Sequence, residues 1–243
     1  MTRDAVKALT VLFLATVVLA GNSAAATVLL YDTSLASPPG VYFGTGNANL
    51  NFTVSQDGVT ELGLSVITRY VGPIDPSAGS NVYTAPTGPP PPGHTGAAWG
   101  FTFSVNTQYS GGTADLGDFT YALTVVDLTA ATSGPTFDPV RAIPDNTGFG
   151  ASGKTAGVNL SAEWGAQNSE SPSFAGFLPG FNPNANDLYK ITLSELSSDG
   201  GTVLQSVSVF ADATAPEPGT FGLFACSLAA LACAGRKLAR RSK

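Results

Sequence analysis

The sequence predicts an all-β protein, an antiparallel β-sandwich of jelly-roll or immunoglobulin-like type, flanked by an N-terminal signal helix and a single C-terminal transmembrane helix. Three observations predict this fold class. Apolar and polar residues alternate over several short segments, as in strands with one buried face. The 28 glycines and 17 prolines among 243 residues favour many turns. Outside the two ends, no segment repeats apolar residues at helical spacing, so a parallel sheet with crossover helices is not expected.

The expected strands follow one another along the chain, separated by turn-rich segments. A short strand is expected at 28–31, and a further one at 158–164. The other strands are predicted by alternation at Leu50, Phe52 and Val54; Leu62, Leu64, Val66 and Thr68; Phe101, Phe103 and Val105; Phe119, Tyr121, Leu123 and Val125; Ile191 and Leu193; and Val203, Val207 and Val209.

Between these strands, one segment and two tryptophans invite a functional reading. Segment 86–94 contains four consecutive prolines, which favour an extended conformation and cannot lie in a central strand. We expect a projecting loop that acts as a spacer, with docking of a partner as the alternative. Trp99 and Trp164 are expected in the core or at its rim, with an exposed sugar-stacking role as the alternative.

The first 26 residues have the parts of a secretory signal peptide. Arg3 and Lys7 precede an apolar run at 8–20, which is too short to span a bilayer comfortably. Ala24 and Ala26 then supply the small residues that signal peptidase requires at the −3 and −1 positions. We expect cleavage after Ala26 and an exported domain at 27–213.

The last 30 residues, 214–243, have the parts of a membrane anchor. Residues 219–235 are mostly apolar, and their 17 positions reach the lower limit for a transmembrane helix. A basic cluster follows at Arg236, Lys237, Arg240, Arg241 and Lys243. Because such clusters stay on the cytoplasmic side, the domain before the helix is expected across the inner membrane.

Pro216, Glu217 and Pro218 stand directly before this apolar run and its basic tail. The three parts together resemble the PEP-CTERM sorting signal of Gram-negative bacteria. The resemblance implies that an exosortase-type transpeptidase cuts near the motif and passes the protein from an inner-membrane intermediate to the cell surface or extracellular matrix. A permanently anchored periplasmic domain is the alternative, and it predicts that the tail persists.

The charge of the domain and the positions of the cysteines exclude a nucleic-acid partner and a disulfide within the domain. Between Asp32 and Glu217 there are four basic and sixteen acidic residues, a net charge of −12. Such a domain repels a phosphate backbone, so no nucleic-acid partner is expected. Both cysteines, Cys226 and Cys233, lie in the C-terminal apolar run, so the domain must fold without a disulfide.

The glycine-rich segment 148–155 satisfies the P-loop pattern with Gly148, Gly153, Lys154 and Thr155. The pattern binds phosphate only between a buried strand and a helix. Neither flank is expected here, because a proline-broken segment precedes the motif and a strand is expected after it. We therefore interpret the segment as a glycine-rich loop and expect no nucleotide cofactor.

Other chemistry has few candidates. His94 is the only histidine and lies in a Pro/Gly loop, where a solvated side chain is expected rather than a catalytic base or a zinc ligand. Two groups of acidic residues are considered for calcium, Asp115 and Asp118 near Asp127, and Asp138 near Asp145. Glu163 and Glu170 are considered as a glycosidase pair. A solvated acidic surface is the expectation for all of them, with no catalytic residue and no metal.

The resulting hypothesis is a non-enzymatic cell-surface or matrix protein with a structural or adhesion role linked to exopolysaccharide or biofilm. The alternative is a secreted carbohydrate-binding or carbohydrate-active protein. An enzyme of that kind needs a cleft with two carboxylates about 5 to 10 Å apart beside an exposed aromatic side chain.

Overall fold

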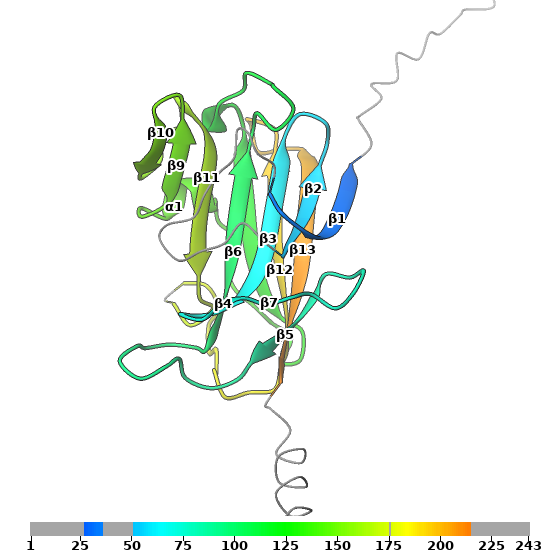
Figure 1. Ribbon diagram of the computed structural model, residues 1–243, viewed down its shortest axis with the longest axis vertical. Helices are drawn as coiled ribbons and strands as arrows, with labels where there is room; N and C mark the ends of the chain where they lie inside the picture. The colour runs from blue at the N-terminus through cyan, green and yellow to red at the C-terminus, as the bar shows by residue number, and fades with distance from the viewer. Residues whose placement is uncertain (1–26, 36–50, 175, 215–243) are drawn as a thin grey trace, which may run out of the picture.

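The computed structural model describes residues 27–35, 51–174 and 176–214, and these residues form two β-sheets packed face to face (Figure 1). Sheet A has the strand order β1-β2-β3-β6-β11-β9-β10, with β4 paired to β3. Its strands are β1 (Val28–Thr33), β2 (Phe52–Gln56), β3 (Glu61–Thr68), β4 (Gly72–Pro73), β6 (Trp99–Asn106), β9 (Thr147–Gly150), β10 (Gly153–Ala156) and β11 (Glu163–Glu170).

Sheet B has the order β5-β13-β12-β7-β8. Its strands are β5 (Val82–Pro86), β7 (Thr120–Asp127), β8 (Thr132–Ser133), β12 (Leu188–Leu196) and β13 (Val203–Thr214). The pairing is antiparallel except between β13 and β5, which run parallel. The described part of the chain contains two short helices, η1 (Leu116–Asp118) and α1 (Pro139–Ala142), so the predicted all-β class is confirmed for the domain.

The core lies between the sheets and is built by period-2 alternation. In sheet A, Leu64 pairs with Phe103, and in sheet B, Ile191 pairs with both Val125 and Val209. All five side chains are buried and belong to one apolar cluster that joins the sheets. Because alternate residues point to opposite faces of a strand, each alternating segment supplies one row of this cluster.

Seven of the expected strands are found, at β1, β2, β3, β6, β7, β12 and β13. The prediction of a strand at 158–164 is wrong. Leu160 to Ala162 form a turn, with the amides of Ala162 and Glu163 donating to the carbonyl of Asn159, and the strand β11 begins only at Glu163. Turn hydrogen bonds at Asn159 compete with strand pairing there.

The interpretation of 148–155 as a loop is also wrong. Gly148 and Gly150 lie in β9 and Gly153, Lys154 and Thr155 lie in β10, and these strands form an antiparallel hairpin. The glycines fit a strand here for a steric reason: a Cβ at either Gly148 or Gly150 would come within 3.0 Å of β11 or the segment before it. The segment is therefore not the strand–loop–helix that phosphate binding requires.

The two tryptophans have different environments. Trp99 is buried and its ring centroid lies 5.2 Å from that of Tyr189 in the core. Trp164 is half-buried on β11 and packs edge-on against Phe149 at 5.9 Å. The core-or-rim expectation is confirmed for both.

A chain of hydrogen bonds crosses the interior between the sheets. The Ser55 hydroxyl donates to Oε1 of Gln205 at 3.1 Å, and Nε2 of Gln205 donates to the Thr60 hydroxyl. That hydroxyl in turn donates to Oε1 of Glu195 at 3.1 Å. Glu195 is fully buried, and its Oε2 atom has no hydrogen-bond partner. This series of hydrogen bonds thus ends at the buried Glu195 carboxyl group, of which only one oxygen has a hydrogen-bond partner.

In the segment between β5 and β6, residues 87–96 extend away from the sheets as predicted for the proline-rich loop, whereas Ala97 and Ala98 are buried next to β6 (Figure 1). Pro86 ends β5, which is an edge strand, where proline is tolerated because one side needs no ladder hydrogen bond. The last described strand, β13, reaches Thr214. In the described residues no helix has the length and apolar character needed to cross a bilayer.

Candidate functional site

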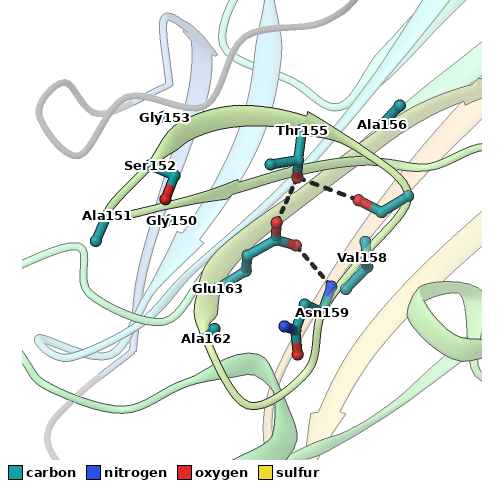
Figure 2. Close-up of a pocket in the computed structure, with 11 residues that line it drawn as sticks. Gly150, Ala151, Ser152, Gly153, Thr155, Ala156, Val158, Asn159, Ala162 and Glu163 are labelled. Carbon is teal, nitrogen blue, oxygen red and sulfur yellow. Dashed lines mark hydrogen bonds between the residues drawn. The ribbon is translucent and has the colours of Figure 1, made fainter.

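Two hollows in the surface of the described domain are candidates for a binding site. The first has a volume of about 490 Å³ and lies beside the β9–β10 hairpin (Figure 2). Small residues line most of it, and the carboxylate of Glu163 is its one acidic group. A buried carboxylate in a hollow is a typical ligand contact, so its hydrogen bonds decide what it can do.

Both oxygens of Glu163 are already occupied by the protein. Oε2 accepts from the backbone N–H of Asn159 at 2.8 Å, and Oε1 accepts from the hydroxyl of Thr155, as Figure 2 shows. A Cβ at Gly148 would collide with this carboxylate. Glu163 therefore holds the hairpin and the following turn together, which is a structural role rather than a free catalytic or binding group.

The acidic residues considered for chemistry are not brought together. Glu163 and Glu170 begin and end β11, and seven steps of about 3.3 Å put them roughly 23 Å apart. This separation is far larger than a glycosidase pair requires. In the same way, Asp115 and Asp118 lie at η1 before β7, whereas Asp127 ends that strand.

The remaining acidic pair serves local structure. The Asp138 carboxylate caps α1 by accepting from the amides of Val140 and Arg141, and it forms an ion pair with the Arg141 side chain. Asp145 accepts from the amide of Asn168 at 3.1 Å. Within the described residues, no three side chains of His, Cys, Asp or Glu are grouped as they would be around a metal ion.

The second candidate is the surface beside the second hollow, where aromatic rings surround a guanidinium. We call this group the aromatic–arginine cluster, and its members are Arg69, Tyr70, His94 and Phe174. It forms at the end of the sandwich where β3 ends and β6 begins, since Thr68 pairs with Trp99 there. Arg69 and Tyr70 follow β3, His94 comes from the proline-rich loop, and Phe174 follows β11. Three segments far apart in the sequence therefore supply it.

The geometry of the cluster is that of stacked planar groups. The guanidinium carbon of Arg69 lies 4.9 Å from the ring centroids of both Tyr70 and Phe174. The imidazole of His94 stacks on the Tyr70 ring at 3.6 Å with an interplanar angle of 14°. Arg69 also donates to the Tyr70 hydroxyl at 2.8 Å and to the Thr95 carbonyl at 3.0 Å. His94 is exposed, as expected, but its ring is oriented by Tyr70.

Tyr70 and Phe174 are exposed to 56% and 39%, which is high for aromatic side chains held in place by neighbours. Phe174 also lines the second hollow, of about 540 Å³, together with Ser173, Leu178 and Phe181. The cluster and this hollow form one surface that combines ring faces with N–H and O–H donors. Such a combination suits a ligand with both apolar faces and hydroxyl groups, as sugars have.

Glu170 lies beneath this surface and is nearly buried. Burial is the main cause that raises its pKa to about 7; the charge of Asp145 raises it further, and that of Arg69 opposes the rise. The group is therefore partly protonated at neutral pH. Its electrostatic interactions with Asp145 and Arg69 place it near the cluster.

Sequence reasoning did not find Arg69, Tyr70 or Phe174. A signal was present, because Tyr70 and Val71 continue an apolar pattern past the end of a strand, and Phe174 is an isolated aromatic in a Ser/Pro-rich turn segment. Aromatic residues in such turns have no sheet face to cover and are candidates for surface contacts.

The sorting and processing residues of the sequence analysis lie outside the described residues. These are Ala24 and Ala26, the motif Pro216, Glu217 and Pro218, and the basic cluster Arg236, Lys237, Arg240, Arg241 and Lys243. Compared with known proteins, the chain matches no family model, no curated protein and no solved structure.

Proposed function

We propose that this chain is an exported, non-enzymatic protein of the cell surface or extracellular matrix, delivered by its C-terminal sorting signal. The observation that carries the proposal is the order of three parts at 216–243: the Pro-Glu-Pro motif, an apolar run and a basic cluster. Signal peptidase would remove the N-terminal signal and an exosortase-type transpeptidase would then cut at the C-terminal motif. Between these two steps the protein would be anchored in the inner membrane. The sandwich, of jelly-roll or immunoglobulin-like type in this proposal, would be the domain that is delivered.

The position of the last strand supports this order of events. β13 ends at Thr214, two residues before Pro216, so cleavage at the motif would leave the whole sandwich intact. The two prolines of the motif lack backbone N–H donors and favour an extended backbone, which suits binding in a protease cleft. The domain boundary and the proposed processing site therefore coincide.

The mass of the mature protein tests the proposal. In protein recovered from the native surface or medium, we expect termini near Thr27 and near Pro218. A Glu217→Gln variant should retain the full tail, whereas a Glu195→Gln variant, with the same chemical change inside the domain, should be processed normally. A wild-type mass that still includes 236–243 would overturn sorting and leave a permanently anchored periplasmic domain.

A carbohydrate-binding role is the second candidate, and the aromatic–arginine cluster favours it. Although Arg69 lies in the cluster, the net charge of −12 between Asp32 and Glu217 repels an anionic polysaccharide, so a neutral polysaccharide is the expected ligand. In native gel electrophoresis, the protein should migrate more slowly through gels that contain dextran, laminarin or galactomannan than through a gel without polysaccharide. Alginate is the acidic control. Tyr70→Ala should lose the retardation while Val59→Ala, exposed at the opposite end, keeps it. No retardation by any of the three neutral chains would overturn this role.

A further inference from the structure

The first strand is unusually exposed for its composition. Among the described residues, β1 forms the outer edge of sheet A and pairs with β2 alone (Figure 1). Its four apolar residues are exposed to 50% at Val28, 42% at Leu29, 37% at Leu30 and 38% at Tyr31. Successive side chains point to opposite faces, so β1 presents apolar groups on both faces of the sheet.

Sheet edges normally carry features that prevent pairing with another chain, such as very short strands, lysine or proline. In the described residues, the other three edges have such features. β8 has two residues, β5 ends in Pro86, and β10 carries the exposed Lys154. In β1 the first charge is Asp32, where the backbone turns to a φ of +51° and the pairing register shifts. Residues 28–31 are therefore the unprotected part.

We propose that β1 pairs antiparallel with β1 of a second copy of this chain, joining two copies of sheet A into one continuous sheet. The occupant follows from the chemistry of the edge. With the two-fold axis at Leu29, residues 28–30 oppose one another and Tyr31 opposes Thr27, so no charge opposes another charge. A two-fold pair uses both free edges, so the contact closes as a dimer and does not extend into a filament.

The charge of the domain predicts how this contact responds to salt. Each copy carries −12 between Asp32 and Glu217, so two copies repel one another outside the uncharged strand. Added salt screens this repulsion and should therefore strengthen the dimer. A contact between opposite charges would instead become weaker at raised salt. The inference is independent of the sorting proposal, because it concerns only the folded domain.

Position-specific crosslinking of the full-length chain tests the pairing. The domain contains no cysteine, so Cys226→Ala and Cys233→Ala give a cysteine-free background. Single cysteines are then placed at Val28, Leu29, Leu30 and Tyr31, with Val59→Cys as the control. Val59 is 47% exposed but lies in the turn between β2 and β3. Directly opposite residues in an antiparallel pair have Cα atoms about 4.5 to 5.5 Å apart, within disulfide range.

Mild oxidation should give a disulfide-linked dimer at one or two β1 positions, several-fold above the yield at Val59→Cys and higher at raised salt. In a second experiment, Leu29→Lys in the otherwise wild-type chain should abolish the dimer without lowering the midpoint of thermal unfolding. Equal yields at all five positions would show association elsewhere, for instance through the C-terminal run, and would overturn the inference. A crosslinked product of any mass other than twice the chain would also overturn it.

Discussion

Glu195→Gln should make the protein less sensitive to alkaline pH. Glu195 is fully buried between the sheets, and burial is the main cause that raises the pKa of its carboxyl from 4.5 to about 7. The hydrogen bond from Thr60 opposes this rise, and the negative charge of Asp57 adds to it. The folded protein therefore holds this proton more tightly than the unfolded chain does.

The sign of the effect follows from linkage. A carboxyl whose pKa is raised on folding contributes stability that is fully present below the unfolded pKa and is lost as pH rises through the folded pKa. The window here runs from pH 4.5 to about 7. A difference of roughly 2.5 units at 1.36 kcal/mol each makes the loss about 3 kcal/mol.

The substituted amide stays neutral and keeps an acceptor for Thr60. Its NH2 group takes the place of Oε2, which has no partner, so one buried donor remains unpaired at a cost of about 1 kcal/mol. We therefore expect the variant to be no more stable than the wild type at pH 5, and more stable by about 2 kcal/mol at pH 8.

Urea unfolding at pH 5, 6, 7 and 8, followed by the fluorescence of Trp99 and Trp164, measures this difference. Glu170 contributes in the same direction because burial also raises its pKa to about 7, but it is present in both proteins and cancels in the comparison. Asp75→Asn, at an exposed position, controls for the change in net charge. A difference between wild type and Glu195→Gln that does not change from pH 5 to pH 8 would refute the reasoning.

Two further substitutions test packing, and each is read as a free energy of unfolding in urea. Gly134→Ala should destabilise the protein by about 2 kcal/mol or more, because the added Cβ would lie within 3.0 Å of the Phe177 carbonyl oxygen. Gly112→Ala is the control: the nearest atom to its added Cβ is 3.4 Å away, so it should destabilise the protein by less than half as much. Thr102→Val should stabilise by about 1 kcal/mol, because the buried Thr102 hydroxyl has no hydrogen-bond partner. A loss of stability in Thr102→Val would mean that the hydroxyl is bonded in solution.

The strands with regular alternation could be predicted from the sequence because their signal is local. In β3 and β7, three residues in succession at every second position are apolar, and a strand is the only regular structure that places such residues on one face. The hairpin β9–β10 has no such alternation. Its glycines and small residues are suited to strands only because β11 and the Glu163 carboxylate approach closely, and that contact is not visible in a linear pattern.

The β class of the domain, most of its strands and its acidic charge could be predicted from the residues alone. Three features could not: Arg69, His94 and Phe174 lie in one cluster, Glu163 and Glu170 are far apart, and Glu195 accepts from Thr60 across the two sheets. The difference lies in the sequence separation over which each interaction acts. Alternation and turn preference act between residues a few positions apart, whereas strand order and sheet packing join residues separated by up to 150 positions, as in the bond from Ser55 to Gln205.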